Sequence, residues 1–522
     1  MIILGLGGLN QDAACAVLNN GQLASAIEER KVARQPTPEG LPQAAIGAAL
    51  DVARVLPSDV NCIALVRPFP QEIHLSLRSQ FPHAQIVMVE HHAAHAASAY
   101  YPSPFDEATV LTLDRDGDFR SAARWRASGN QLHLEKDLYY PDSLGDLYSR
   151  VTELLGFQAG ADEHKVQWMS ADASGDEFRP LFDEILGITS SGSSDWPCIN
   201  RSFFDADRLS DGGFSEKFYQ ALGMDEGAAI PDALRAPLAA GLQEAVANTV
   251  LRMAGPAENV CLAGGLAMNA LLVSALEGSK NVFVQPAAGN PGTALGAVFY
   301  AWNNVFGQKS RASLDDLCLG PSFTAEQVKE VLENCKLRFH YFTTTNELLD
   351  RAVRDLNGEK IIAWMQGRME FGPRALGNRS ILASPLNPYS TENLNVYIKH
   401  RESFRKFAAS VPEEVAGEYF EAGPNARYLA TVGRVRPAHR KTFEAAVMGG
   451  NCVRVHMVKD KDNPLFHKLL HAAGKATGLP VLYNTSFNLF GDPLVCTPRD
   501  AVRSFYSSGV DALYAGSFLI EK

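Results

Sequence analysis

The sequence lacks the features that would place the chain in a membrane or give it a disulfide framework. No apolar run approaches the roughly 18 residues that a membrane-spanning helix needs, so we expect no membrane partner. The eight cysteines are scattered and form no CxxC pair, which favours reduced thiols in a cytoplasmic protein. The first residues lack a basic segment and pass directly into a strand pattern, so we expect no signal peptide.

Positive charge is also in short supply. The chain has 48 lysines and arginines against 59 aspartates and glutamates, which gives a formal net charge of -11. A general nucleic-acid-binding protein needs a broad basic face that neutralises phosphates, so we expect no nucleic-acid partner. Lysines and arginines that are concentrated locally could still surround a small anionic substrate. The sequence shows no internal repeat and no low-complexity tract.

The length and pattern of the chain predict two α/β domains. With 522 residues the chain is longer than one hydrophobic core usually supports, and its 46% hydrophobic content is ordinary for a globular protein. Two strand-like runs joined by Asn20 and Gly21 predict a hairpin, and alternating helices and strands follow, which indicates a mixed sheet. The pattern loosens between about 306 and 340. We therefore place the domain boundary there and expect domains at residues 1–320 and 321–522.

A pair of histidines predicts a metal site. His91 and His95 lie in an Ala-rich stretch that favours a helix, where they would stand one turn apart on the same face and could chelate one divalent metal. His92 would point roughly 100° away and is less suited to the same ion. The next apolar strand ends at Asp114, which could supply a third ligand and leave a fourth position open, as in catalytic sites. The alternative interpretation is a set of ordinary surface histidines with satisfied hydrogen bonds.

Two further patterns suit phosphate. Gly-rich turns at 5–8 and 263–265 each lie between a strand and a helix, where backbone N–H groups can bind an anion, although plain tight turns are the alternative. In the C-terminal half, several cations are interleaved with Gly, Pro and Leu rather than with other solvated residues. Guanidinium groups bind phosphoryl oxygens through two parallel hydrogen bonds, so this pattern favours an anion-binding pocket. The alternative is a run of solvated surface charge. The cations are Arg368, Arg374, Arg379, Lys399, Arg401, Arg405 and Arg454.

Five polar and Gly-rich motifs are spread over nearly the whole chain. They are His91-His92-x-x-His95-Ala96-Ala97-x-Ala99-Tyr100, Leu262-Ala263-Gly264-Gly265-x-Ala267-x-Asn269, Gly367-Arg368-x-Glu370-x-Gly372-Pro373-Arg374-Ala375-Leu376-Gly377-x-Arg379-Ser380, Lys399-x-Arg401-Glu402-x-Phe404-Arg405 and Asn484-Thr485-Ser486-Phe487-Asn488. With these motifs the chain resembles the O-carbamoyltransferases of the nodulation-protein and antibiotic-tailoring family, which includes tobramycin and cephem carbamoyltransferases. The third and fifth motifs together are highly specific to that family.

The resemblance implies a fold and a two-step reaction. The first domain would be similar to threonylcarbamoyl-transfer proteins, on the sugar-kinase and actin-like fold, and the second to threonylcarbamoyl-adenylate synthases. The second domain would convert carbamoyl phosphate and ATP, with Mg²⁺, into carbamoyl-adenylate. The first would bind that adenylate on a divalent metal, expected to be Fe²⁺ with Zn²⁺ or Mn²⁺ as alternatives. It would pass the carbamoyl group to a hydroxyl of a small acceptor such as a sugar or another natural product. An oligomer is compatible with this reading.

The resemblance also implies roles for individual residues. His91, His95 and Asp114 would hold the metal, and Arg374 and Lys399 would join them as catalytic residues. Arg374, Lys399, Arg454, Ser486 and Asn488 would serve the activation site. The full set of nucleotide and carbamoyl-phosphate ligands would be Asp12, Gly264, Gly265, Asn269, Arg368, Arg374, Arg379, Lys399, Arg401, Arg405, Arg454, Asn484, Ser486 and Asn488.

The chain departs from the family pattern at two positions near its expected metal site. Gln11 stands where the family commonly has His, and Asn290 stands where an Asp usually supplies a fourth metal ligand. An amide oxygen is a neutral and weaker ligand, which marks a divergent member. Two alternatives stay open: N-carbamoyl or threonylcarbamoyl-type transfer, against which the acidic charge speaks where the acceptor is a nucleic acid, and a non-catalytic nucleotide-binding relative that has lost its metal.

Overall fold

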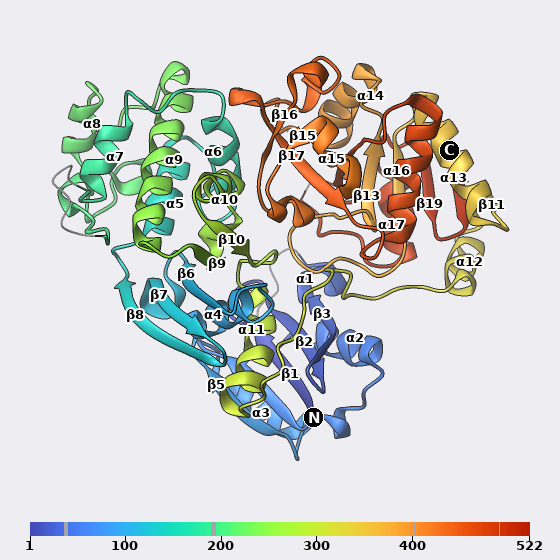
Figure 1. Cartoon of the computed structure of the whole chain (residues 1–522), viewed down its shortest axis with the longest axis horizontal. Coiled ribbons are helices and arrows are strands. Elements are labelled where there is room, and N and C mark those ends of the chain that lie inside the picture. The colour runs from blue at the N-terminus through green and yellow to red at the C-terminus, as the bar shows by residue number, and fades with distance from the viewer. Residues whose placement is uncertain (36–39, 189–194, 401, 490) are drawn as a thin grey trace. The chain divides into compact units, whose positions relative to one another are not determined.

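In the computed structural model the chain forms two compact units, and Figure 1 labels most of their helices and strands. Unit 1 contains residues 1–90, 290–447 and 453–522, and unit 2 contains residues 91–289 and 448–452. Among the residues that the structure describes, no helix combines the length and the apolar character that crossing a membrane requires. The described residues are 1–35, 40–188, 195–400, 402–489 and 491–522.

The N-terminal sheet of unit 1 has five strands in the order β3-β2-β1-β4-β5. β1 pairs antiparallel with β2 and parallel with β4, so the sheet is mixed, as predicted. The predicted hairpin joins β2 to β3, and Asn20 and Gly21 both have the positive φ that such a turn needs. The strands are β1 (Ile2–Gly7), β2 (Ala14–Asn19), β3 (Gln22–Glu28), β4 (Cys62–Val66) and β5 (Gln85–Val89). The helices that accompany them are α1 (Glu29–Ala33), α2 (Gln43–Ala53), α3 (Gln71–Gln80) and α11 (Gly292–Tyr300).

Glycines in β1 let a helix come close to this sheet. α11 packs on β1, β2 and β4. A Cβ atom at Gly5 would lie 2.3 Å from the carbonyl oxygen of Ala294, and one at Gly7 would lie 2.2 Å from Oγ1 of Thr293. Both positions therefore need glycine for packing. The turn predicted at 5–8 between a strand and a helix is instead the end of β1, which leads to β2, and close packing explains Gly5 and Gly7 without a phosphate.

The C-terminal sheet of unit 1 has ten strands in the order β11-β20-β19-β12-β13-β18-β14-β17-β16-β15. The strands are β11 (His340–Tyr341), β12 (Ile362–Met365), β13 (Arg379–Ala383), β14 (Ala408–Pro412), β15 (Phe420–Glu421), β16 (Gly433–Val435), β17 (Cys452–Val458), β18 (Leu482–Ser486), β19 (Ala512–Ala515) and β20 (Phe518–Glu521). The helices of this part are α12 (Ala325–Asn334), α13 (Thr345–Asn357), α14 (Pro388–Asn393), α15 (Glu413–Tyr419), α16 (Pro464–Thr477) and α17 (Pro498–Tyr506).

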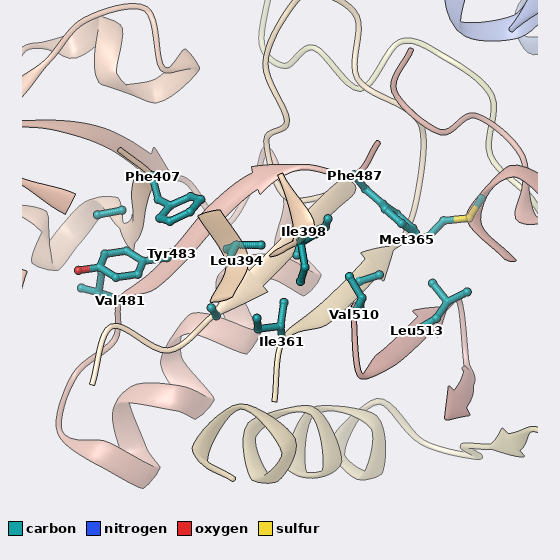
Figure 2. Close-up of a cluster of buried hydrophobic side chains, with 14 of the residues drawn as sticks. Ile361, Met365, Leu394, Ile398, Phe407, Val481, Tyr483, Phe487, Val510 and Leu513 are labelled. Carbon is teal, nitrogen blue, oxygen red and sulfur yellow. The ribbon is translucent and has the colours of Figure 1, made fainter. Parts of the chain in front are cut away.

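The two faces of this sheet bury different hydrophobic clusters, because side chains alternate along each strand. Ile361 and Met365 of the β12 segment belong to the cluster of Figure 2, in which Phe407 and Tyr483 also lie. Trp364, on the alternate face of β12, packs in a second cluster that includes side chains from α13 and α16. Burial on both faces explains why the central strands read as continuous apolar runs.

Unit 2 repeats the topology of the N-terminal sheet. Its five strands have the order β10-β9-β6-β7-β8, with β6, β7 and β8 antiparallel and β6, β9 and β10 parallel. The repeat is one of strand order and direction, and the sequence shows no sign of it. The strands are β6 (Glu107–Leu113), β7 (Arg120–Ser128), β8 (Gln131–Tyr139), β9 (Asn259–Ala263) and β10 (Asn281–Val284).

Helices cover this second sheet and continue into a helical region. α4 contacts β6 and β9, whereas α9 packs against α6 and α7. The α/β class predicted from the sequence is confirmed, and the pair of like sheets agrees with the sugar-kinase or actin-like architecture expected for the first part of the chain. The helices are α4 (His91–Tyr100), α5 (Leu144–Leu154), α6 (Glu163–Ser170), α7 (Arg179–Ile185), α8 (Glu216–Ala221), α9 (Asp232–Ala254) and α10 (Ala270–Glu277).

Candidate functional site

The histidine pair and Asp114 lie together in unit 2. α4 begins at His91, and both His91 and His95 are buried on it. The Nε2 atoms of His91 and His95 lie 2.7 Å and 2.9 Å from the same carboxylate oxygen, Oδ2 of Asp114. The three potential ligand atoms lie within 4.8 Å of one another. This is the arrangement that the four-residue spacing and the strand-end carboxylate predicted, and both histidines are buried instead of lying at the surface; the metal itself stays a prediction.

Asp114 is held by the turn that follows β9. Its Oδ1 atom accepts a hydrogen bond of 2.8 Å from the N–H of Gly265, and its own N–H donates to the carbonyl of Ser121 at 2.8 Å. Gly264 has φ +97°, and a Cβ atom there would lie 2.2 Å from the carbonyl oxygen of Leu113. The Gly-Gly pair thus lets the turn approach β6 and present an amide to Asp114. The turn at 263–265, which was predicted to bind phosphate, donates its Gly265 amide to the carboxylate of Asp114.

Charge favours the ionised form of Asp114. Burial by itself would raise the pKa of Asp114, but the adjacent His95 and His91 outweigh it and hold that pKa well below its usual range. His92 is different: its Nε2 lies 2.6 Å from the carbonyl oxygen of Arg120, so this nitrogen carries the proton. Its Nδ1 then accepts from the hydroxyl of Thr112 at 2.7 Å. Burial lowers the pKa of His92 well below its usual value, so His92 is a neutral side chain engaged in the fold.

Two imidazoles and a carboxylate fit a first-row divalent metal. Such an ion binds nitrogen and oxygen at about 2.0–2.2 Å, and this donor set is used for both zinc and non-haem iron. The ligand atoms are already close enough that small side-chain movements would bring them to those distances. Fe²⁺, Zn²⁺ and Mn²⁺ all accept imidazole and carboxylate ligands of this kind. Asn290 belongs to unit 1, where its carbonyl accepts a 2.6 Å hydrogen bond from the hydroxyl of Thr293.

A second group of predicted residues gathers in unit 1, around a lysine. Lys399 follows the short helix Leu394–Ile398, and its Nζ donates to the carbonyl of Ser486 at 2.6 Å. It also donates to the carbonyl and the side-chain oxygen of Asn488, at 3.0 Å and 2.8 Å. Ser486 in turn donates from its hydroxyl to Oδ1 of Asn488 at 2.7 Å. Three of the five residues expected in the activation site therefore form one hydrogen-bonded cluster.

Strand pairing places Asn484, two residues before Ser486, on the same sheet face as Arg454, and a hydrogen bond places it beside Arg374. Asn484 of β18 pairs with Ala408 of β14, and Ala408 pairs with Arg454 of β17. Paired residues point to the same face, and neighbouring strands are about 4.8 Å apart, so Arg454 and Asn484 stand about 10 Å apart on one face. Asn484 also donates to the carbonyl oxygen of Ala375 at 3.2 Å, next to Arg374. Burial lowers the pKa of Arg374 to about 10, which leaves it charged at neutral pH.

Sequence reasoning missed a serine and a histidine beside Asn484. The amide of Asn484 donates to the hydroxyl of Ser410 at 3.2 Å, and that hydroxyl lies 3.0 Å from Nδ1 of His456. Burial lowers the pKa of His456 to about 3, so the ring is neutral and Nδ1 can accept. The chain of contacts fixes the orientation of the Asn484 amide. The only signal in the sequence is the alternation of polar and apolar residues along β14 and β17.

Two of the arginines predicted to bind an anion donate hydrogen bonds to backbone carbonyls. Arg379 is fully buried and donates to the carbonyls of Gln366, Gly367 and Asn378 at 2.6–3.3 Å. Arg368 donates to the carbonyls of Gly320, Leu319 and Ala24 at 2.8–3.1 Å. Both guanidinium groups therefore hold the main chain together, and their expected role as anion ligands stays a prediction.

The buried Glu370 completes that scaffold. Its Oε1 accepts from the N–H groups of Leu376, Asn378 and Arg379 at 2.8–3.0 Å. Burial lowers the pKa of Arg379, and the carboxylate of Glu370 offsets part of that effect. Lys31, which sequence reasoning also missed, is buried and donates to the carbonyl of Glu370 at 2.9 Å. The polar loop 366–380 is thus shaped by buried charges.

The remaining predicted ligands make their described contacts outside the two clusters. Arg405 lies 3.5 Å from Glu402, and Arg401 lies outside the described residues. Asp12 lies 3.6 Å from Arg30, and burial raises the pKa of Asp12 although Arg30 opposes the change. Asn269 caps α10, because its Oδ1 accepts from the N–H of Leu272 at 3.0 Å. Its amide donates to Gln243 at 2.7 Å. The contacts of Asn269 are therefore structural.

Two family models match the chain. One described as Carbamoyltransferase N-terminus matches residues 71–299, and one described as Carbamoyltransferase C-terminus matches residues 353–522. Together they cover more than half of the sequence, so the chain belongs to the carbamoyltransferase family, and it is a transferase. The family resemblance inferred from the five motifs is confirmed.

Individual relatives agree with the family. The chain is 30% identical to the nodulation protein NolNO of Sinorhizobium fredii, over 98% of this chain and 79% of that protein. It is 31% identical to the 3'-hydroxymethylcephem-O-carbamoyltransferase of Amycolatopsis lactamdurans, over 45% of this chain and 43% of that protein. Among solved structures, the ROK hexokinase of Thermus thermophilus is similar at 17% identity and a TM-score of 0.29, over 59% of this chain and all of that one. This last likeness concerns the fold alone.

A prediction follows from the turn that holds Asp114. Gly264→Ala places a methyl group against the Leu113 carbonyl in an unfavourable backbone conformation, so we expect a loss of about 2–3 kcal/mol in the free energy of unfolding. Gly47→Ala is the matched control, because a Cβ in this α2 position meets nothing within 4 Å and should be neutral or stabilise by about 0.5–1 kcal/mol. Urea unfolding measures both. Equal stability of the two variants would contradict the close approach.

Proposed function

We propose that the chain is an ATP-dependent O-carbamoyltransferase that carbamoylates a hydroxyl of a small metabolite, such as a sugar or another natural product. The observation that carries the proposal is the buried group of His91, His95 and Asp114 in a chain of the carbamoyltransferase family. The cephem relative, whose name specifies transfer to oxygen, supports a hydroxyl acceptor. Under this proposal residues 1–320 carry out transfer and residues 321–522 carry out activation.

The activation step makes a reactive carbamoyl donor. Hydrolysis of carbamoyl phosphate releases carbamate and phosphate, and a carbamate oxygen then attacks the α-phosphorus of ATP. The bond between the α- and β-phosphates breaks, pyrophosphate leaves, and carbamoyl-adenylate forms. Negative charge moves onto the phosphate oxygens during this displacement, and positioned cations stabilise such charge. ATP enters as its Mg²⁺ complex.

The cluster around Lys399 supplies the groups that this step needs. Arg374 and Arg454 would bind phosphate oxygens of the nucleotide, because a guanidinium donates two parallel hydrogen bonds to a phosphate. Lys399 holds Ser486 and Asn488 in place through three hydrogen bonds of 2.6–3.0 Å. The Ser410–His456 pair fixes the amide of Asn484 at the same polar face. A rigid set of donors lowers the cost of reorganisation at the moment of reaction.

The transfer step joins the carbamoyl carbon to the acceptor. The acceptor hydroxyl attacks that carbon, the bond to the phosphate of AMP breaks, and the hydroxyl proton is released. A divalent metal held by His91, His95 and Asp114 would supply a Lewis acid that polarises the carbamoyl oxygen. The Gly265 amide keeps Oδ1 of Asp114 engaged, so Oδ2 is left to face the two histidines. Burial of all three side chains limits water, which would otherwise hydrolyse the donor.

The histidine pair can be tested by separating the two steps. His95→Ala should remove one equivalent of metal and lower carbamoyl transfer from supplied carbamoyl-adenylate by at least about 100-fold, whereas pyrophosphate release should continue. Metal analysis and product mass spectrometry measure the two effects. His133→Ala is the control, since His133 is exposed on β8 of the same unit. Full transfer by His95→Ala without its metal would contradict the assignment.

The activation cluster has a complementary test. Arg374→Ala should lower carbamoyl-phosphate-dependent release of pyrophosphate from ATP by about 100-fold, because a cation that meets the developing charge is lost. Transfer from supplied carbamoyl-adenylate should persist. Arg354→Ala removes an exposed guanidinium from α13 and should leave both steps unchanged. If Arg374→Ala released pyrophosphate at the rate of the unmodified enzyme, Arg374 would not be a phosphate ligand.

A further inference from the structure

A second pair of histidines shares a carboxylate oxygen in unit 1. His467 and His471 are one turn apart on α16, and their Nε2 atoms lie 2.9 Å and 2.7 Å from Oε1 of Glu414. The three potential ligand atoms lie within 4.8 Å of one another. The donors and their sharing of a single oxygen match those of His91, His95 and Asp114. None of the five family motifs includes these residues.

Rigid elements hold the three side chains. Glu414 lies in the first turn of α15, which begins directly after β14, and both α15 and α16 pack against that strand. α16 has a well-defined start, because the Oδ1 of Asn463 accepts from the N–H of Phe466 and Pro464 occupies the first turn. Donors on packed helices keep their separation without a ligand, which lowers the cost of binding one.

The surroundings favour a cation that is partly open to solvent. The side chains of His467, His471 and Glu414 are 13%, 41% and 52% exposed, so an ion can enter and water can complete its coordination. A second carboxylate oxygen, from Asp460, lies 3.7 Å from Nδ1 of His467, the ring nitrogen that faces away from Glu414. At that distance Asp460 adds negative charge beside the site and makes no hydrogen bond to the ring.

We propose that Glu414, His467 and His471 form a second metal site, which binds a divalent transition metal of the zinc class and joins α15 to α16. Two imidazole nitrogens and one carboxylate oxygen suit zinc and its first-row neighbours, whereas Mg²⁺ and Ca²⁺ prefer oxygen ligands alone. The ion links two helices that flank the same strand, so it stabilises the C-terminal sheet by binding the folded state only. The competing interpretation is a set of ion pairs between Glu414 and protonated histidines.

A zinc titration of the full chain separates these interpretations. The protein is stripped with a chelator and titrated with Zn²⁺ by calorimetry, with Co²⁺ absorption as a second readout. We expect two equivalents in the unmodified chain, one in His471→Ala and one in His95→Ala, and none in the double variant. Glu414→Gln keeps the shape of the side chain and should weaken the second equivalent at least about tenfold. His340→Ala, an exposed histidine on β11, should keep both.

Thermal unfolding with and without Zn²⁺ completes the test. Zinc should raise the Tm of the unmodified chain and of His95→Ala by more than it raises the Tm of Glu414→Gln or His471→Ala. Circular dichroism checks that each variant is folded. If Glu414→Gln and His471→Ala bound Zn²⁺ with unmodified number and affinity, the proposal would be overturned. Equal destabilisation of these variants with and without zinc would assign the cluster to ion pairs, and would leave the proposed carbamoyl transfer untouched.

Discussion

One buried carboxylate, that of Asp114, ties together the elements of the candidate metal site. Removing an ionised carboxylate from water is costly unless charges and hydrogen bonds compensate, and Asp114 receives both. Two imidazoles on α4 approach one of its oxygens, and the amide of Gly265 donates to the other. The end of β6, the first two turns of α4 and the turn after β9 must therefore keep their separations for the charge to stay compensated. A bound cation would add to that compensation, which couples the stability of this part of unit 2 to its proposed chemistry.

The arginines of the C-terminal sheet divide according to what surrounds them. Arg379 is enclosed by main chain, so its donors meet carbonyl oxygens, and with Glu370 it fixes the path of the loop 366–380. Arg454 stands on the polar part of a sheet face, in register with Asn484 across β14. Arg379 donates to three main-chain carbonyls, so its guanidinium supports the shape of the loop. Arg454 is half-buried on the polar part of the sheet face, and under the proposed function it faces the nucleotide.

The parts of the candidate site that lie on one helix or one strand could be predicted from the sequence. The parts that depend on contacts between segments distant in the chain could not. The spacing of His91 and His95 and the position of Asp114 after an apolar strand are properties of one helix and one strand, and the structure brings these residues together as expected. Whether a guanidinium meets a phosphate or a carbonyl depends on segments distant in the chain. For Arg368 the partners include Ala24, more than 300 residues away. The repeat of strand order in the two five-stranded sheets was likewise invisible, because topology is set by pairing and not by residue identity.

Under the two proposals, burial more than ligand identity separates the reactive histidine–carboxylate group from the stabilising one. Their donors are alike, and in each the two Nε2 atoms lie 2.7–2.9 Å from one oxygen. Around Asp114 the side chains are buried, so the local dielectric is low, electrostatic effects on a bound substrate are strong and water is kept from the reacting group. Around Glu414 the solvent screens those effects, and a bound ion there would mainly restrain two helices. The same donor set can thus serve reaction in one unit and stability in the other.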